Sequence, residues 1–305
     1  MKIDAIILAA GKGKRMQSAS PKVLQQVAGK ALLQHVLDTS LELKSCQPHI
    51  VVGDQASLVK ASVSAPKNSK WSKQAKQLGT GHAVKQSLKG LRAGSIALIL
   101  YGDVPLVKSS TMNNLVKAAG KSSLALLSFE QQTPKGYGRI IRSPGGKVLG
   151  IVEEKDATTE QKKITEVNSG IMAVASNKLE ELLKGLKNKN AAKEYYLTDI
   201  VAIADQMGLK AVYDVAPEEE VAGVNSRLDL SALEQQFQDR KRLAAMEAGV
   251  TLIDPQSVTF CHDTQVENDV LIEPNVVFGP KVKISSDTII RAFSHLEGCH
   301  IGAGA

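Results

Sequence analysis

A repeat of six residues near the end of the chain is the feature that most constrains its fold. Branched or aromatic residues recur at this interval between residues 266 and 296, and small or branched residues recur four positions after each of the first five. Such hexads are typical of a parallel β-helix, in which each hexad forms one face and three hexads make one turn of the coil. The two series are Val266, Ile272, Phe278, Ile284, Ile290 and Leu296, and Val270, Val276, Val282, Thr288 and Ser294.

The coil is expected to contain one irregularity and to stop abruptly. Between Leu296 and Ile301 the spacing shortens to five, which predicts a local slip. The chain ends at Ala305 after about two coils, and a coil end without a cap exposes strand edges and apolar interior. We therefore expect a truncated form or a fragment of a longer protein.

The other end of the chain predicts a strand that leads into a phosphate-binding loop. An apolar run from Ile3 to Ala10 is followed by Gly11 and Gly13, which lack Cβ atoms and let backbone N–H groups approach an anion. The spacing fits neither a P-loop nor a dinucleotide fingerprint, which would need a third small residue where Met16 stands. Positive charge surrounds the loop on Lys12, Lys14, Arg15 and Lys22.

Between these ends, strand and helix patterns alternate, which predicts an α/β fold with a doubly wound sheet. Ligands of such sheets bind at the carboxyl ends of strands, where Gly11 and Asp103 fall. The expected strands are Ile3–Leu8, Ile50–Val52 and Ile96–Tyr101, and the expected helices include Leu32–Leu43 and Met112–Ala119.

A long polar helix is predicted from Arg227 to Ala248 and should end at Gly249. We expect it to connect two domains, because 305 residues exceed what one compact core usually accommodates. The predicted divisions are 1–226 for the α/β domain, 227–249 for the linker helix and 250–305 for the coil.

Composition is typical of a cytoplasmic protein. No apolar stretch approaches the roughly 20 residues needed to span a bilayer, and the amino terminus is unlike a signal peptide. Cys46, Cys261 and Cys299 are far apart and lack a zinc-site spacing, so we interpret them as reduced thiols. The net charge of +7 raises the possibility of nucleic-acid binding, but only 4% of residues are aromatic, and a solvated basic face is the better interpretation.

Seven segments in order resemble the sugar-1-phosphate nucleotidyltransferases. More narrowly, they resemble the bacterial N-acetylglucosamine-1-phosphate uridylyltransferases, which form the amino-terminal half of a bifunctional enzyme whose other half is a glucosamine-1-phosphate N-acetyltransferase. The resemblance implies a Rossmann-like nucleotidyltransferase domain and a left-handed β-helix. The segments are Leu8–Met16 with Pro21-Lys22, Gln74–Ala83, Tyr101–Pro105, Gly136–Ile140, Ile151–Asp156, Glu166–Gly170 and Gly223–Arg227.

The resemblance implies Mg²⁺-dependent synthesis of UDP-N-acetylglucosamine and pyrophosphate from UTP and N-acetylglucosamine-1-phosphate, for cell-wall and lipopolysaccharide precursors. Such a transfer relies on positioning and charge neutralisation. Arg15 and Lys22 are the catalytic candidates, because both side chains can hold phosphate oxygens. Asp103 is a natural oxygen ligand for Mg²⁺, although taken alone it could equally cap the turn at Pro105; Asn225 is the second metal ligand that the resemblance implies.

Substrate contacts are also implied by the resemblance. Uracil, ribose and phosphates would be held by Leu8, Ala9, Ala10, Gly11, Lys22, Gln74, Gly79, Thr80, Tyr101, Gly102, Asp103 and Asn225, and the sugar by Gly138, Glu153 and Asn168. The last three also have plain alternatives as a bulge, a surface charge and a turn residue. Lys14, Lys76 and Ser169 depart from the family pattern, and no catalytic task is evident for His82.

Two other hypotheses remain. The same transfer could use another nucleotide and hexose phosphate, or the chain could be a non-catalytic nucleotide-sugar sensor or a coil assembly module. The presence of Arg15, Lys22, Asp103 and Asn225 together favours an enzyme. The family's acetyl transfer is expected to be missing from this chain, and a homotrimer is expected where the coil is complete.

Overall fold

The computed structural model describes residues 1–11, 13–122, 124–209 and 211–305, and they divide into two compact units. Unit 1 comprises residues 1–24 and 32–225, and unit 2 comprises residues 25–31 and 226–305. The predicted boundary near residue 226 lies close to this division. The segment Gln25–Ala31 belongs to unit 2 because its contacts are with the long helix and the coil.

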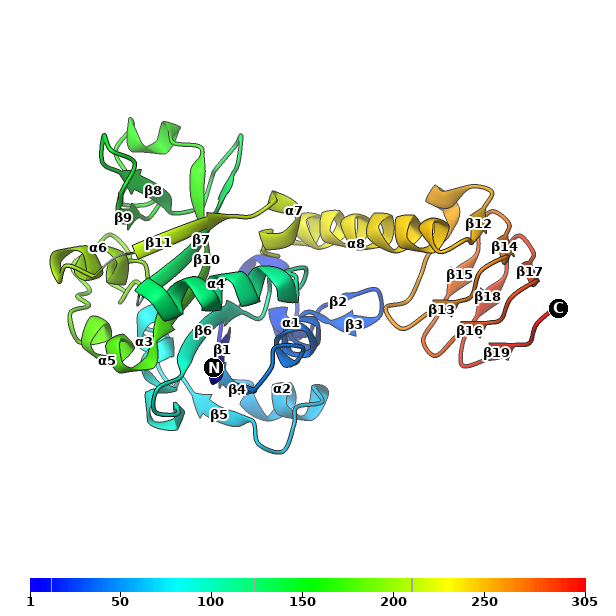
Figure 1. Cartoon of the computed structure of the whole chain (residues 1–305), viewed down its shortest axis with the longest axis horizontal. Helices are drawn as coiled ribbons and strands as arrows, with labels where there is room; N and C mark the ends of the chain where they lie inside the picture. The colour runs from blue at the N-terminus through cyan, green and yellow to red at the C-terminus, as the bar shows by residue number, and fades with distance from the viewer. Residues whose placement is uncertain (12, 123, 210) are drawn as a thin grey trace. The chain divides into compact units, whose positions relative to one another are not determined.

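Unit 1 is built on a mixed sheet with the strand order β11-β7-β10-β6-β1-β4-β5 (Figure 1). The strands from β6 to β5 are parallel, as predicted, whereas β10 runs antiparallel to both of its neighbours β6 and β7. The strands are β1 (Ile3–Ala9), β4 (Cys46–Val52), β5 (Lys70–Lys73), β6 (Ile96–Tyr101), β7 (Leu124–Glu130), β10 (Glu166–Ala175) and β11 (Ala211–Val215), with a hairpin of β8 (Arg139–Arg142) and β9 (Val148–Val152) beside β10.

Both faces of this sheet are buried, which explains why the central strands are mostly apolar, as in Ala5–Ala9 of β1 and Ile50–Val52 of β4. Alternate residues of β1 point to opposite sides, Ala5 and Ile7 into one core cluster and Ile6 and Leu8 into the other. The first cluster includes buried residues of α1 and α4, and the second those of α5 and α6. The helices are α1 (Leu32–Leu41), α2 (Ala56–Ser62), α3 (Thr80–Lys85), α4 (Ser109–Ser122), α5 (Ser176–Lys184), α6 (Asp199–Gln206) and α7 (Glu218–Val221), with short 3-10 turns at Lys14–Met16, Lys22–Leu24, Leu88–Gly90 and Gln161–Lys163.

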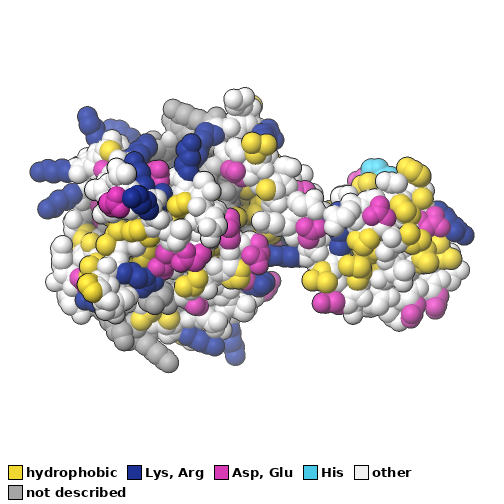
Figure 2. Space-filling model, turned by 90° about the horizontal axis from the view of Figure 1, so that it is seen from above, with side chains coloured by type: hydrophobic (Ala, Val, Ile, Leu, Met, Phe, Trp, Pro, Cys, Tyr) yellow, Lys and Arg dark blue, Asp and Glu magenta, His cyan; other side chains and the backbone are white. Residues whose placement is uncertain are grey.

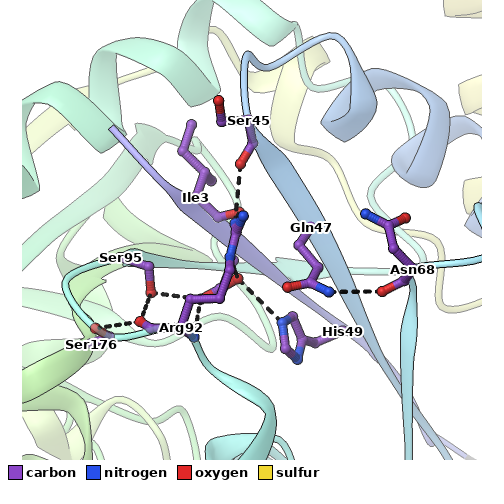
Figure 3. Close-up of polar contacts among 9 residues, drawn as sticks. Ile3, Ser45, Gln47, His49, Asn68, Arg92, Ser95 and Ser176 are labelled. Atoms are coloured by element: carbon purple, nitrogen blue, oxygen red, sulfur yellow. Dashed lines mark hydrogen bonds and ion pairs between the residues drawn. The ribbon is translucent and has the colours of Figure 1, made fainter.

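A buried polar cluster lies at the start of β1, at the opposite end of the strand from the glycine loop (Figure 3). Asp4 is fully buried and accepts hydrogen bonds from Ser95 Oγ at 2.6 Å and from Arg92 Nε and backbone N at 2.8 Å each. His49 Nε2 lies 3.3 Å from the same carboxylate. Burial alone would raise the pKa of Asp4, but hydrogen bonds from His49, Ser95 and Arg92 outweigh it and lower the pKa to about 2.

Unit 2 begins with a short hairpin and the predicted long helix, α8 (Arg227–Glu247). The helix starts at a capping box in which Ser226 and Asp229 satisfy each other's backbone N–H groups, and Gly249 adopts a φ of +91° just after its end. The hairpin strands are β2 (Gln26–Val27) and β3 (Lys30–Ala31).

The coil of unit 2 is a parallel β-helix with three short sheets, as the hexads predict. Leu271 pairs with Ile289 and Val277 with His295, so one turn takes 18 residues. Inward residues such as Ile272 and Phe278 form a continuous core. The sheets are β12 (Thr251–Leu252), β14 (Leu271–Ile272) and β17 (Ile289–Ile290); β13 (Gln265–Val266), β16 (Lys283–Ile284) and β19 (His300–Ile301); and β15 (Val277–Phe278) with β18 (His295–Leu296), after a 3-10 turn at Pro255–Ser257.

The predicted slip is visible at the end of the coil. Ile284 pairs with Ile301, which is one residue short of a full turn, and Gly298 takes a φ of +61° in the shortened corner. Ile301 nevertheless packs against the coil core.

The visible face of the larger body carries charges of both signs. On the face shown in Figure 2, its Lys and Arg side chains occur at several places, with Asp and Glu side chains among them. Within the described ranges, no helix has both the length and the apolar character to cross a membrane.

Candidate active site at the end of the first strand

The glycine loop leaves β1 and turns back against Lys22. The backbone N–H of Met16 donates to the carbonyl of Gly13 at 2.8 Å, which closes the turn. Gly13 has a φ of +55°, and a Cβ there would lie 2.7 Å from Cβ of Lys22, so a side chain is excluded on both counts. Lys12 and the side chain of Lys14 lie outside the residues that the structure describes.

Four polar residues from distant parts of the sequence meet beside this loop. The Lys22 ammonium forms an ion pair with the Asp103 carboxylate and lies 3.3 Å from Oδ1 of Asn225. Arg15 Nη2 donates to the same Asn225 oxygen at 3.0 Å. Asn225 is brought here because the backbone N–H of Val224 donates to the carbonyl of Asp103 at 3.0 Å. Two side-chain oxygens and two cationic groups are thereby held within one group.

A cavity of about 380 Å³ opens beside this group. Its size is within the range of small-molecule sites, and both polar and apolar side chains line it. Of the residues predicted from the sequence, it is lined by Leu8, Ala10, Gly11, Lys22, Gln74, Gly79, Thr80, Tyr101, Asp103 and Asn225. Ala9 lines a second cavity, which shares Ala10, Gly11 and Gln77 with the first.

One corner of the cavity is formed by Gln74 and the start of α3. The Gln74 side-chain nitrogen donates to the carbonyl of Gly79 at 3.0 Å and lies 3.1 Å from Nδ1 of His82. These contacts engage the amide nitrogen and orient the buried side chain. Burial lowers the pKa of His82, which favours the neutral imidazole, and the tautomer with its proton on Nε2 accepts at Nδ1. His82 therefore positions Gln74, a role that the sequence analysis did not assign.

Gly79 must be glycine for structural reasons. Its φ is +103°, and a Cβ would lie 2.6 Å from the backbone oxygen of Tyr195. The backbone N–H of Gly81 donates to that same oxygen at 2.9 Å, and the Thr80 hydroxyl accepts from the N–H of Leu197 at 3.0 Å. The segment around Tyr195 is thereby fixed against the base of α3, and Glu194 reaches the cavity from it.

Gln77 is a cavity residue that the sequence analysis missed. Its side-chain nitrogen donates to the carbonyl of Ala10 at 2.7 Å, so it braces the backbone just before Gly11. The only signal for it was its place inside the segment Gln74–Ala83, where the neighbouring Gln74 received the role. Other lining residues without an earlier assignment are Val23, Ala83, Val104, Tyr137, Glu194, Val221 and Gly223.

The three predicted sugar contacts lie together, but outside the lining of this cavity. The N–H of Asn168 donates to the carbonyl of Gly138 at 2.9 Å, and a Cβ on Gly138 would lie 3.6 Å from the Glu153 carboxyl. Oδ1 of Asn168 is buried and has no hydrogen-bond partner among the described residues. Such an acceptor is costly unless a ligand or water satisfies it.

Glu153 is held by a neighbouring hydroxyl. Thr198 Oγ1 donates to its Oε1 at 2.8 Å. Burial raises the pKa of the Glu153 carboxyl and the nearby carboxylates add to this, while the hydrogen bond from Thr198 opposes it. This residue is therefore a partly buried acceptor and not the surface charge of the plain alternative.

The end of β6 is packed tightly around Tyr101. A Cβ on Gly170, whose φ is +85°, would lie 2.6 Å from the Tyr101 ring. Burial and then the negative charges of Glu153 and Asp103 raise the pKa of the phenol, which stays protonated. Ser169, a departure from the family pattern, donates its hydroxyl to the carbonyl of Leu127 at 2.6 Å. The Gly102 N–H donates to the carbonyl of Leu8 at 3.0 Å, so the role of Gly102 in the structure is to join β6 to β1.

Comparison with known proteins agrees with this geometry. The model of the MobA-like NTP transferase domain matches residues 5–193. A protein of Cellvibrio japonicus named bifunctional protein GlmU is 43% identical over 320 residues, which cover 99% of this chain and 70% of that protein. A protein of Roseobacter denitrificans with the same name is 46% identical over 307 residues, which cover 100% and 68%. The solved structure of a UDP-glucose pyrophosphorylase complexed with UDP-glucose superimposes with a TM-score of 0.63 at 16% identity, over 79% of this chain and 100% of that one, and supports the fold of unit 1.

Proposed function

This chain belongs to the family of the bifunctional GlmU proteins, and we propose that it transfers a uridylyl group from UTP to N-acetylglucosamine-1-phosphate, giving UDP-N-acetylglucosamine and pyrophosphate. The observation that supports this best is the grouping of Arg15, Lys22, Asp103 and Asn225 beside one cavity. Nucleotide binding alone does not need two cations and two oxygen ligands at the same point.

The reaction requires positioning more than proton transfer. A phosphate oxygen of the sugar phosphate attacks the α-phosphorus of UTP and forms a new P–O bond. The bond from the α-phosphorus to the oxygen that bridges it to the β-phosphorus breaks, and pyrophosphate leaves with that electron pair. Negative charge shifts towards the leaving group, and Arg15 and Lys22 hold phosphate oxygens as this happens. The backbone N–H groups of the loop at Gly11 and Gly13 would border the polyphosphate in this proposal.

A divalent cation fits the oxygen atoms of this site, and we propose that it is Mg²⁺. The Asp103 carboxylate and the Asn225 amide oxygen already share one cation, the Lys22 ammonium. Mg²⁺ prefers hard oxygen ligands and needs only one or two of them from the protein. Asp103 and Asn225 would hold it, and it would supply charge neutralisation for the phosphates. Lys22 would then be directed to the substrate phosphates.

The corner around Gln74 suits a uracil ring. Because the amide nitrogen of Gln74 is engaged by Gly79 and His82, its oxygen is the atom left to accept from N3–H of the base. Backbone groups of Ala10, Gly11 and Gly79 border the same space. A cytosine, which has no N3–H, would leave this acceptor without a donor, and this favours uridine nucleotides.

We assign the sugar to the group of Gly138, Glu153 and Asn168. The buried Asn168 Oδ1 needs a donor, which the acetamido N–H of the sugar or one of its hydroxyls can provide. The Glu153 carboxylate can accept from a second hydroxyl while Thr198 holds its other side. Gly138 has no side chain because a Cβ there would lie 2.8 Å from Cγ2 of Ile151, so its backbone can approach the Glu153 carboxyl closely. Assembly into a homotrimer through a complete coil is part of the same proposal.

The test measures pyrophosphate release with Mg²⁺, UTP and N-acetylglucosamine-1-phosphate, beside other nucleoside triphosphates, glucose-1-phosphate and an EDTA control. We expect metal-dependent release that is selective for UTP and the acetylated sugar. Asp103→Asn should reduce turnover on the order of 100-fold or more. The matched control Asp214→Asn removes an exposed carboxylate on β11 and should leave turnover unchanged.

Each other outcome would change the proposal in a defined way. Release with a different nucleotide or sugar phosphate would retain the reaction and overturn the assigned substrates. Binding of UDP-N-acetylglucosamine without turnover in any combination would favour the non-catalytic alternative. Equal activity of Asp103→Asn and Asp214→Asn would refute the assigned metal ligand.

A further inference from the structure

A thiol, an imidazole and a carboxylate converge in one turn of unit 2, outside the candidate active site. Cys261, His262 and Asp263 each place one ligand atom within 4.8 Å of the other two. The turn is closed by a hydrogen bond from the N–H of Thr264 to the carbonyl of Cys261 at 3.3 Å. The sequence did not predict this group, because its three residues are consecutive and lack the spacing of a known zinc motif. Consecutive side chains of a strand point to opposite sides, whereas those of a turn can face the same point.

The ligand atoms already have the spacing of a tetrahedral metal site. Sγ of Cys261 lies 3.4 Å from Nδ1 of His262, and these two atoms lie 3.2 Å and 3.1 Å from the carbonyl oxygen of Ala28. Zinc binds such atoms at about 2.0–2.3 Å, which corresponds to distances of about 3.3–3.8 Å between the ligands of a tetrahedron. The triangle formed by Sγ of Cys261, Nδ1 of His262 and the carbonyl oxygen of Ala28 therefore has sides close to, or slightly shorter than, those between three ligands of a tetrahedral zinc site.

Hydrogen bonding alone does not satisfy this triangle well. The Ala28 carbonyl also accepts from the backbone N–H of His262 at 2.9 Å, so three possible donors approach an oxygen with two lone pairs. A cation that shared Sγ, Nδ1 and the carbonyl oxygen would relieve this crowding.

Asp263 supplies the fourth atom. Its Oδ2 accepts from the N–H of Lys281 at 3.0 Å, which fixes the direction of the carboxylate. Its Oδ1 is buried and makes no hydrogen bond of good geometry in the part of the chain that the structure describes, and the Cys261 thiol is the donor that approaches this carboxylate. A cation bound between the thiolate and the carboxylate would satisfy both groups.

We propose that Cys261, His262, Asp263 and the carbonyl of Ala28 form a zinc site that joins the β2–β3 hairpin to the coil. The mixture of sulfur, nitrogen and oxygen ligands suits Zn²⁺ and does not suit Mg²⁺. Four protein ligands leave no open position, so the site is structural. It is independent of the proposed uridylyl transfer, whose residues all belong to unit 1.

The hairpin is shaped for this approach. Ala28 and Gly29 both have positive φ values, +50° and +75°, and a Cβ on Gly29 would lie 3.0 Å from Sγ of Cys261. The N–H of Ala28 donates to Oε2 of Glu234 at 2.7 Å, which holds the same peptide from its other end. The carbonyl of Ala28 is therefore aimed at the cluster by contacts that do not depend on a metal.

The cluster also contains a competing cation. Lys241 donates to the carbonyl of Thr264 at 3.1 Å and is close enough to influence Asp263 and Cys261. Burial lowers the pKa of this lysine, while the charges of Asp263 and Cys261 oppose that shift. Zinc binding by the Cys261 thiol would release the thiol proton.

The experiment uses the full chain, freed of metal with a chelator that is then removed. Zn²⁺ is titrated against a chromophoric competitor, and Co²⁺ is used in parallel because a cobalt–thiolate bond gives a charge-transfer absorption. We expect one equivalent of zinc, a cobalt–thiolate band and a higher melting temperature with zinc than without it. Cys261→Ser should abolish the band and weaken zinc binding by about tenfold or more, and Asp263→Asn should weaken it similarly.

Cys299→Ser is the matched control, since it removes another thiol of unit 2 and should retain the band and the affinity. The proposal is overturned if the unmodified chain binds no stoichiometric zinc. It is also overturned if Cys261→Ser and Asp263→Asn bind as the control does, which would indicate adventitious binding elsewhere. Circular dichroism of each variant separates loss of the site from loss of the fold, and Asp263→Asn decides the question if Cys261→Ser is unfolded.

Discussion

Replacing Asp4 with Asn is expected to lower the free energy of unfolding of unit 1 by about 2 kcal/mol at pH 7. The pKa of this carboxyl falls from 3.8 to about 2 on folding, and each pKa unit corresponds to about 1.4 kcal/mol. Because the side chain is fully buried, no reduction for solvent screening is needed. The carboxylate of Asp4 accepts hydrogen bonds from Arg92 and Ser95 (Figure 3). The amide N–H₂ of Asn is itself a donor and would face one of these donors, which lowers the stability of the variant further.

The pH dependence has a definite sign. A carboxyl whose pKa is lowered by folding contributes stability that is complete above its unfolded pKa, near 3.8, and is lost as the pH falls through its folded pKa, near 2. The difference between the unmodified chain and Asp4→Asn should be constant from pH 7 to pH 5. It should shrink as the pH falls below about 4, because the unmodified chain then loses the advantage that the variant lacks.

The single tryptophan makes the measurement specific to unit 1. Trp71 lies on β5, opposite Ile50 of the strand β4 that carries His49, so its fluorescence in urea reports the unfolding of this sheet. Glu42→Gln is the control, since it removes one exposed carboxylate of the same unit. This reasoning would be refuted if Asp4→Asn were as stable as Glu42→Gln at pH 7. It would also be refuted if the difference in free energy of unfolding between the unmodified chain and Asp4→Asn grew as the pH falls below 4.

Three further predictions concern other buried contacts. Gly170→Ala should destabilise unit 1 by about 2 kcal/mol or more in a urea titration, because its φ of +85° is unfavourable for alanine and the new methyl group meets the Tyr101 ring; unchanged stability would contradict the tight packing. Thr198→Val removes the donor that stabilises ionised Glu153 and should raise the pKa of this carboxyl further. The acidic limb of the pH profile of kcat/KM should therefore move to higher pH, and an unchanged acidic limb would contradict this prediction. Arg242→Met should lower the free energy of unfolding of unit 2 by about 3 kcal/mol and speed hydrogen exchange in α8, because this buried guanidinium donates to two backbone carbonyls of the unit. Exchange as slow as in the unmodified chain would show that these hydrogen bonds are dispensable.

The elements that the sequence predicted best are those in which a local pattern repeats. The hexads of the coil repeat one inward position many times, and even the slip before Ile301 appears in the pairing of β16 with β19. Strand β6 has the predicted bounds, Ile96–Tyr101, because a fully buried strand is an unbroken apolar run. The direction of β10 was not predictable in this way, since the run Ile171–Val174 is equally buried in a parallel and in an antiparallel neighbour.

In the candidate site, the types of residue were readable but their partners were not. Lys22 was predicted to hold phosphate, and its ion pair with Asp103 joins residues 81 positions apart, which no local spacing reveals. His82 had no evident task because its contact with Gln74 depends on how α3 meets β5. Likewise, the segment around Ala28 belongs to unit 2 through a bond to Glu234 that only the folded chain creates.

The position of Lys22 makes it a counterion that is tethered to the protein. Its ammonium lies between the oxygens of Asp103 and Asn225, so a divalent cation that used these oxygens would have to displace it. Because Lys22 is part of the chain, its effective concentration at this point is high and does not depend on the solution. On the proposed function, the displaced ammonium would gain a new partner from the polyphosphate. Exchange would then be favoured with nucleotide and disfavoured without it, and by thermodynamic reciprocity each would strengthen the binding of the other. Lys22 would in this way oppose loading of the proposed site with metal before the nucleotide binds.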